Sequence, residues 1–194
     1  MNGLIFRGVF LYQLVAVLAD FKIESQFKNQ LLNDYDPSAR PIRNSKQPID
    51  VSIQLLLRQI VDLDEKNQIL VSAMLIRLVW TDEQLVWSNT ANSSKLPKRI
   101  ILPYQRVWTP DLYIYNNVAS SKSNQGFLNV NGSQVLIHEN GVVHWNLPIT
   151  VQSSCLVDVL YFPFDHQVCE IQIASWTYDE AQLKLHVEVS LQTN

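Results

Sequence analysis

The chain has 194 residues and a formal net charge of -3, and only 17% of its residues are charged. Nucleic-acid-binding domains present a basic surface, so this charge balance argues against a nucleic-acid partner. Hydrophobic residues make up 47% of the chain and include five tryptophans, which is enough for the core of one folded domain and excludes general disorder.

The first nineteen residues have the features of a secretory signal peptide. Arg7 is the only charged residue before Asp20, and residues 8–19 (GVFLYQLVAVLA) form a short apolar run that ends in small residues. A membrane-spanning helix needs about 20 apolar residues, so this run is too short to be one. We therefore expect a signal peptide over residues 1–19 and a mature, exported chain over residues 20–194. The alternative is a buried hydrophobic helix.

A short amphipathic helix is predicted at the start of the mature chain. Residues 25–34 carry Phe27, Leu31 and Leu32 at helical spacing, and Pro37 then ends any helix.

From Val51 onward the hydrophobic period changes to two, which is typical of half-buried strands. A long strand is predicted over residues 51–63 and a second over residues 69–80, joined by a polar turn. Further short strands are predicted over residues 126–129, 134–139, 141–146, 155–160, 169–175 and 182–190. The pattern favours an all-β, immunoglobulin-like sandwich capped by the N-terminal helix.

Two Asn-x-Ser sequons, at Asn92 and Asn131, lie among turn-forming residues where a glycan could be exposed. They agree with the expected export of the chain.

Cys155 and Cys169 are the only cysteines, and they enclose residues 156–168 (LVDVLYFPFDHQV). A single bridge between them is the simplest arrangement. Zinc sites usually take about four ligands in closely spaced clusters. The sequence offers no such cluster, so neither a metal site nor a cofactor site is expected.

This loop, centred on Phe162, Pro163, Phe164 and Asp165, closely resembles the signature loop of the Cys-loop receptors, the pentameric neurotransmitter-gated ion channels. Other stretches are similar to the extracellular domain of nicotinic acetylcholine receptor subunits, in the same order along the chain. These stretches are residues 40–44 (RPIRN), 64–68 (DEKNQ), 80–87 (WTDEQLVW), 108–117 (WTPDLYIYNN) and 176–179 (WTYD).

The resemblance implies a site for a cation. A quaternary ammonium group has no hydrogen to donate, and it binds instead to the electron-rich faces of aromatic rings. In the family, a tyrosine of loop A and a tryptophan of loop B form two walls of the cage, and they correspond to Tyr115 and Trp176. Trp80, Trp87 and Trp108 correspond to structural residues, and we expect them in the core.

The resemblance also implies a complementary face, which a neighbouring subunit presents. The positions that correspond to it are Leu75, Arg77, Leu136, His144 and Asn146. Leu75 stands where many family members have a tryptophan, and leucine offers no ring face to a cation. These residues could equally be ordinary surface or interface residues.

The resemblance further implies a Cys155–Cys169 disulfide and a loop that contacts the transmembrane domain during gating. We expect the Phe162-Pro163-Phe164 tip to be an interaction surface and the bond before Pro163 to be a candidate for the cis form.

In family members, the chain continues after the position that corresponds to residue 190 with a hairpin called loop C and then with four transmembrane helices. The sequence ends at Asn194 and has no apolar run of about 18 residues, so we expect the last strands to be missing. No GxSxG, HExxH or glycine-rich phosphate loop occurs, which argues against an enzyme.

The resemblance therefore implies the extracellular domain of a channel subunit in a homo- or hetero-pentamer at the postsynaptic plasma membrane. Its ligand is expected to be a small, acetylcholine-like cation, and it reaches the membrane only through a transmembrane domain. Two alternatives stay open. One is a secreted truncated isoform that modifies assembly or acts as a ligand-binding decoy, and the other is a non-functional fragment.

Overall fold

The computed structural model describes residues 23–88, 90, 96–118, 128 and 130–188. The expected signal peptide, the sequon at Asn92 and most of the expected strand 126–129 lie outside these residues. Within the described part, residues 23–31 are helical and overlap the predicted helix. The elements that follow are β1 (Ile49–Asp64), β2 (Ile69–Val86), β3 (Arg99–Pro103), the 3-10 helix η2 (Tyr104–Arg106), β4 (Leu112–Ile114), β5 (Gln134–His138), β6 (Asn140–Ser154), β7 (Ile173–Ser175) and β8 (Leu183–Glu188).

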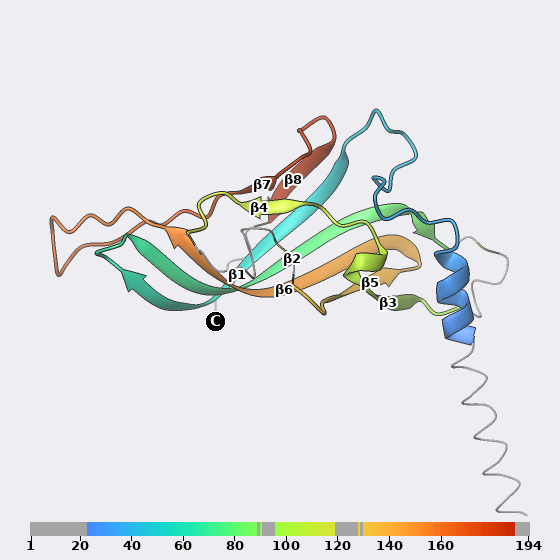
Figure 1. The fold of residues 1–194 in the computed structure, drawn as a ribbon, viewed down its shortest axis with the longest axis horizontal. Coiled ribbons are helices and arrows are strands. Elements are labelled where there is room, and N and C mark those ends of the chain that lie inside the picture. The colour runs from blue at the N-terminus through green and yellow to red at the C-terminus, as the bar shows by residue number, and fades with distance from the viewer. Residues whose placement is uncertain (1–22, 89, 91–95, 119–127, 129, 189–194) are drawn as a thin grey trace, which may run out of the picture.

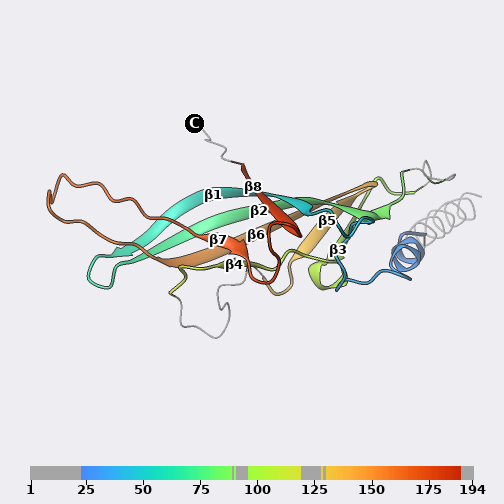
Figure 2. The same cartoon turned by 90° about the horizontal axis from the view of Figure 1, so that it is seen from above.

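These strands form two sheets, which Figures 1 and 2 show from two directions. The larger sheet has six strands in the order β3-β5-β6-β2-β1-β8, and the smaller sheet pairs β4 with β7. The β1–β8 pair is parallel, and the other pairs are antiparallel. The prediction of an all-β sandwich with an N-terminal helix is confirmed.

The core lies between the two sheets. In β2, side chains alternate strictly between the faces of the sheet, so Met74, Ile76, Leu78 and Trp80 are buried. The short strand β4 buries Leu112 and Ile114 in the same hydrophobic cluster. Trp87 and Trp108 are also buried, as expected for structural tryptophans.

β1 covers the strand predicted over residues 51–63, but the burial expected from the apolar alternation fails in its second half. Val51 and Ile53 are buried, but Leu57 and Val61 are 57% and 51% exposed. Two register shifts interrupt the pairing with β2, between Leu57 and Gln59 and again beyond Ile60. Residues 57–62 are all exposed, on both faces of the strand, so no described part of the chain covers this end of β1 and the apolar alternation does not mark a buried face here.

Other strand boundaries also differ from the prediction. Residues 155–160 form no strand, and only the last three residues of the predicted strand 169–175 do, because the disulfide-closed loop between them projects away from the sheet. β3 and β4 were not predicted, since strands of five and three residues are too short for a clear period. β6 continues through Pro148. The pairing of β6 with β5 ends at Trp145, before Pro148, so the missing N–H of this proline removes no hydrogen bond between β6 and β5.

One glycine allows the hairpin that starts β6 to pack closely. Gly141 has a φ of +84°, and a Cβ atom there would lie 2.4 Å from the backbone oxygen of Asp82. Any larger residue would push this turn away from β2.

A buried carboxyl group ties the segment after the helix to the sandwich. The Tyr35 hydroxyl donates to Asp82 Oδ2 at 2.6 Å and accepts from the Trp108 backbone N–H at 2.9 Å. Burial raises the pKa of Asp82, and burial and the adjacent Asp82 charge raise the pKa of Tyr35. The charged form of Asp82 is therefore less favourable in the folded state, and its contribution to stability falls as the pH rises above the ordinary aspartate range.

Tyr35→Phe removes the hydroxyl and leaves Asp82 Oδ2 and the Trp108 N–H without this partner. We expect the free energy of unfolding to fall by about 1.5–3 kcal/mol, the range for hydrogen bonds to charged groups. Denaturant titration at neutral pH measures this change. Tyr161→Phe is the control, since Tyr161 is 71% exposed and its loss should change stability by less than about 0.5 kcal/mol. Equal stability of the two variants would contradict the role of Tyr35.

Candidate ligand-binding site

The smaller sheet presents aromatic side chains on its outer face. Leu112 and Ile114 of β4 point into the core, so Tyr113 and Tyr115 point outward. Leu112 pairs with Ser175 in β7, and Trp176 follows directly after that strand. Two segments that are distant in the sequence therefore bring their aromatic rings together.

The rings of Tyr113, Tyr115 and Trp176 form one cluster. The ring centre of Trp176 lies 4.9 Å from that of Tyr113 and 6.1 Å from that of Tyr115, to which it is roughly parallel. Tyr115 is 49% exposed and Trp176 is 55% exposed. The structure thus brings together the two predicted principal-face residues. Sequence reasoning missed Tyr113, although its spacing of two residues from Tyr115 on a short strand was a usable signal.

Asp111 holds the backbone that carries Trp176. Its carboxylate accepts hydrogen bonds from the Ser175 hydroxyl at 2.5 Å, from the Thr177 N–H at 2.8 Å and from the Thr177 hydroxyl. The Trp176 N–H donates to the Asp111 carbonyl oxygen at 3.1 Å. The Tyr115 hydroxyl donates to the Ser175 carbonyl oxygen at 3.1 Å. These bonds fix both rings relative to one another before any ligand arrives.

Such a cluster can attract a cation. Each ring face within about 6 Å of a positive charge contributes about 0.5–2 kcal/mol, and tryptophan contributes most. Since about half of the Tyr115 and Trp176 side chains is open to solvent, water weakens these contacts unless another surface covers them.

The five expected complementary residues also lie together, on the outer face of the six-stranded sheet. Arg77 is directly opposite Asn146, and Leu136 is directly opposite His144. Leu75 precedes Arg77 by two residues on the same face of β2. The core of the sandwich separates this face from the aromatic cluster, so one chain does not combine the two sets into one pocket.

This outer face is polar and basic around Arg77. The Arg77 guanidinium donates to Asn146 Oδ1 at 3.2 Å and to Gln54 Oε1 at 3.0 Å. Burial lowers the pKa of His144, and the nearby His138 and Arg77 lower it further.

Cys155 and Cys169 are joined by a disulfide, with their Cα atoms 5.0 Å apart. Cys155 is buried, and its N–H donates to the Gln68 carbonyl oxygen at 2.8 Å. The loop and the β1–β2 turn therefore share one end of the molecule, the left end in Figures 1 and 2.

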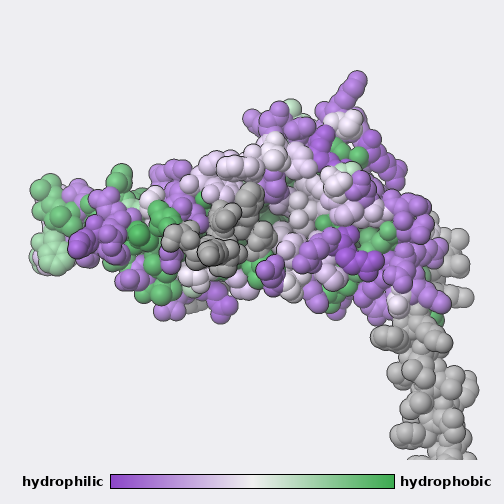
Figure 3. Space-filling view, in the orientation of Figure 1, coloured by the Kyte–Doolittle hydropathy of each residue, from purple (hydrophilic) through white to green (hydrophobic). Residues whose placement is uncertain are grey.

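The tip of this loop is apolar and exposed. Phe162 is 74% exposed and Phe164 is 92% exposed, and the peptide bond before Pro163 is cis. Gln167 braces the loop behind the tip by exchanging hydrogen bonds with the Asp158 backbone and donating to Asp165. Hydrophobic residues, drawn in green in Figure 3, are concentrated at this end of the surface.

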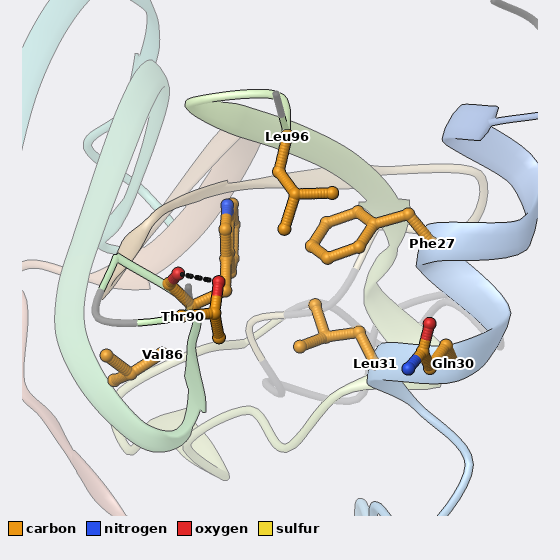
Figure 4. Close-up of a pocket in the computed structure, with 7 residues that line it drawn as sticks. Phe27, Gln30, Leu31, Val86, Thr90 and Leu96 are labelled. Atoms are coloured by element: carbon orange, nitrogen blue, oxygen red, sulfur yellow. Dashed lines mark hydrogen bonds between the residues drawn. The ribbon is translucent and has the colours of Figure 1, made fainter. Parts of the chain in front are cut away.

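A hollow of about 460 Å³ lies elsewhere, between the N-terminal helix and the end of β2 (Figure 4). Phe27 and Leu31 of the helix line it together with Leu96 and Trp87, and the rings of Phe27 and Trp87 are in edge contact. None of the predicted site residues lines this hollow.

Two negative findings concern only the part of the chain that the structure describes. No helix there is long and apolar enough to span a bilayer. No group of three or more histidine, cysteine, aspartate or glutamate side chains there could hold a metal ion.

The sequon residue Asn131 lies exposed in a turn, and the next residue, Gly132, has a φ of +80°.

Residues 24–194 match the family described as the neurotransmitter-gated ion-channel ligand binding domain. The chain belongs to this family. It is 36% identical over 170 residues to the neuronal acetylcholine receptor subunit alpha-9 of Homo sapiens, which covers 88% of this chain and 34% of that relative.

Other relatives give a similar result. The chain is 35% identical over 162 residues to the neuronal acetylcholine receptor subunit alpha-6 of Rattus norvegicus, covering 84% of this chain and 31% of the relative. It is 36% identical over 157 residues to the alpha-9 subunit of Gallus gallus, covering 81% and 31%. The chain thus spans about a third of the length of these relatives.

Asp111→Ala tests how this domain holds Trp176. Loss of the three side-chain bonds should lower the free energy of unfolding by about 1.5–3 kcal/mol. Denaturant titration gives this value, and hydrogen exchange should show faster exchange at the Thr177 amide. Asp62→Ala, at an exposed position of β1, is the control and should change stability by less than about 0.5 kcal/mol. Unchanged exchange at Thr177 would refute the assignment.

Proposed function

We propose that this chain is the extracellular ligand-binding domain of a neurotransmitter-gated channel subunit that binds a small, acetylcholine-like cation at subunit interfaces. The observation that carries the proposal is the cluster of Tyr113, Tyr115 and Trp176, in which Tyr115 and Trp176 are exposed. A fully buried cluster would serve packing alone, whereas Tyr115 and Trp176 are about half exposed and leave ring surface available to a ligand.

The position of the cluster favours a site shared between two subunits. Tyr115 and Trp176 supply the principal face, and a neighbouring subunit supplies the face that corresponds to Leu75, Arg77, Leu136, His144 and Asn146. Both faces point away from the core of a single chain, so contact between the two requires a second copy or a homologous subunit. Such an arrangement repeats around a closed ring, and we infer a pentamer from the family.

Leu75 gives this complementary face a specific property. It is half-buried and apolar, and it contributes contact area without a ring. A homomeric site therefore contains one fewer aromatic wall than a site completed by a subunit with tryptophan at this position, and we expect the heteromeric site to bind a cation more tightly.

We propose that the loop closed by Cys155 and Cys169 transmits ligand binding to a transmembrane domain. Phe162 and Phe164 project into solvent from a braced loop, and Pro163 lies between them, which is the property of a surface that a partner covers. Asp165 differs from them, because it is half-buried and accepts a hydrogen bond from Gln167. We assign it a role in holding the loop rather than in direct contact.

We further propose that residues 1–19 direct export and that the domain lies on the extracellular side of the plasma membrane. The disulfide supports this location, because such bonds persist in oxidising compartments. Glycosylation is proposed at Asn131, whose turn is exposed, and at Asn92 from the sequence alone.

The first test is Trp176→Ala in a full-length receptor that contains this domain. Loss of about 1–2 kcal/mol of cation–π attraction should raise the acetylcholine concentration for half-maximal current by about 5–30-fold. Trp176→Phe is the matched variant, since it keeps a ring face and should cause a smaller shift. Surface labelling checks that both variants reach the membrane. An unchanged agonist response in Trp176→Ala would remove the cluster from the ligand site.

The second test separates gating from binding. Phe164→Ala in the same receptor should reduce the maximal current while the equilibrium affinity for agonist stays within about twofold, because the side chain lies at the far end of a loop that holds no ring of the cluster. Val168→Ala is the control, since Val168 is 75% exposed in the same loop but next to the disulfide. An affinity loss as large as the loss of current would contradict this division.

A further inference from the structure

Two asparagines in the described part of the chain, Asn131 and Asn140, are each followed directly by a glycine. Glycine has no Cβ atom, so no side chain shields its backbone nitrogen from the side chain of the asparagine before it. This nitrogen can attack the asparagine side-chain amide carbon and close a five-membered succinimide ring, a reaction that needs no enzyme. Ring closure requires both residues to move, and the structure holds the two pairs differently.

The pair at Asn140 is held by its surroundings. Asn140 begins β6 opposite Val86 of β2, and its Oδ1 accepts a hydrogen bond from the Val142 N–H at 3.2 Å. Gly141 is buried, and a Cβ atom there would lie 2.4 Å from the Asp82 backbone oxygen. The asparagine side chain reaches the glycine nitrogen only if this hydrogen bond breaks and the backbone bends away from β2. Ring closure at this pair therefore requires local opening of the sheet.

The pair at Asn131 lies in an open turn. The Ser133 N–H closes this turn by donating to the Val130 carbonyl oxygen at 3.0 Å, and Asn131 and Gly132 are both exposed. Gly132 has a φ of +80°, and within the described chain no atom beyond the adjacent residues lies within 4 Å of a Cβ built there. Among the residues that the structure describes, none makes a hydrogen bond to the Asn131 side chain or to the Gly132 N–H. The two groups that would form the ring are therefore unrestrained.

We propose that Asn131 is a site of spontaneous deamidation and that the fold protects Asn140 from the same reaction. The deprotonated Gly132 nitrogen attacks Asn131 Cγ, so that a new N–Cγ bond forms, the Cγ–Nδ2 bond breaks and the amide nitrogen takes up a proton and leaves as ammonia. Water then opens the succinimide at either of its two carbonyl carbons. One product is aspartate. The other is isoaspartate, in which the backbone runs through the former side chain and is longer by one methylene group.

The reaction has a structural consequence, because the residue after this turn holds a buried tryptophan. Ser133 Oγ accepts a hydrogen bond from Trp145 Nε1 at 3.1 Å, and the Ser133 carbonyl oxygen accepts one from the Tyr104 N–H at 3.3 Å. Trp145 is 1% exposed and stacks on the Tyr104 ring. The longer isoaspartate backbone displaces Ser133 and leaves the buried indole N–H without its partner, which lowers stability.

The same asparagine is the sequon residue that we propose as a glycan acceptor. A glycan on Nδ2 changes the leaving group from ammonia to a bulky glycosylamine and restrains the side chain. Deamidation is therefore confined to chains whose Asn131 carries no glycan. The reaction needs neither an agonist nor a partner subunit, so its test is independent of the proposed receptor function.

The experiment follows the purified chain, produced in the bacterial periplasm, where the disulfide forms and no glycan is attached. The chain is incubated at neutral pH in water enriched in heavy oxygen, and its peptides are mapped by mass spectrometry at intervals. The peptide with Asn131 should lose ammonia, gain one solvent oxygen and separate into aspartate and isoaspartate forms. We expect this reaction to be about tenfold or more faster than at Asn140, which reacts only when its strand opens.

Unfolding the chain in urea provides the control, since the two Asn-Gly pairs should then react at similar rates. Asn131→Gln is the matched variant: it keeps an amide but would need a larger ring, and it should abolish the modification at this position. Equal rates at Asn131 and Asn140 in the folded chain would overturn the proposal. So would an unmodified Asn131 in the folded chain when the unfolded chain reacts, or a difference in rate that persists in urea.

A second measurement tests the consequence for Trp145. Isolated isoaspartate chains should unfold at a lower denaturant concentration than the parent. Freshly purified Asn131→Asp carries the new charge without the additional methylene group, and it should unfold like the parent. Equal unfolding of the isoaspartate chains and the parent would contradict the displacement of Ser133.

Discussion

Burial of one face of the six-stranded sheet is the constraint on which the rest of this structure depends. Side chains alternate with a period of two, so fixing Met74, Ile76 and Leu78 inside also fixes Leu75 and Arg77 outside. A slip of one residue would place an arginine in the core. The register that hydrophobic burial selects is therefore the same register that assembles the polar face around Asn146 and His144.

Side chains of the smaller sheet alternate in the same way on the opposite side of the core. Leu112 and Ile114 are buried and anchor β4 to the core. The alternating residues Tyr113 and Tyr115 therefore point outward. Packing and recognition are thus coupled through alternation, because each buried side chain orients an exposed neighbour. The two outward faces lie on opposite sides of one core. A site that combines the two faces, as we propose, therefore needs a second chain.

Hydrogen bonds to carboxylates add the local precision that hydrophobic burial lacks. Asp82 joins the segment after the helix to the sandwich through Tyr35, and Asp111 shapes the bend that carries Trp176. The disulfide and the hydrogen bonds of Gln167 fix the loop between Cys155 and Cys169 in a similar way. These bonds hold the aromatic rings and the loop in one arrangement, which reduces the ordering cost of the ligand binding that we propose.

The sequence by itself predicted the fold class and the long strands β1 and β2, and it singled out Tyr115 and Trp176, because period, cysteine spacing and motif order can be read along the chain. It did not determine the short strands, the exposure of Leu57 and Val61, or the true extent of β6. Only the tertiary structure brought Tyr113 into the aromatic cluster and His138 next to His144. These contacts join residues from different strands, and their geometry depends on strand register, which no local pattern specifies.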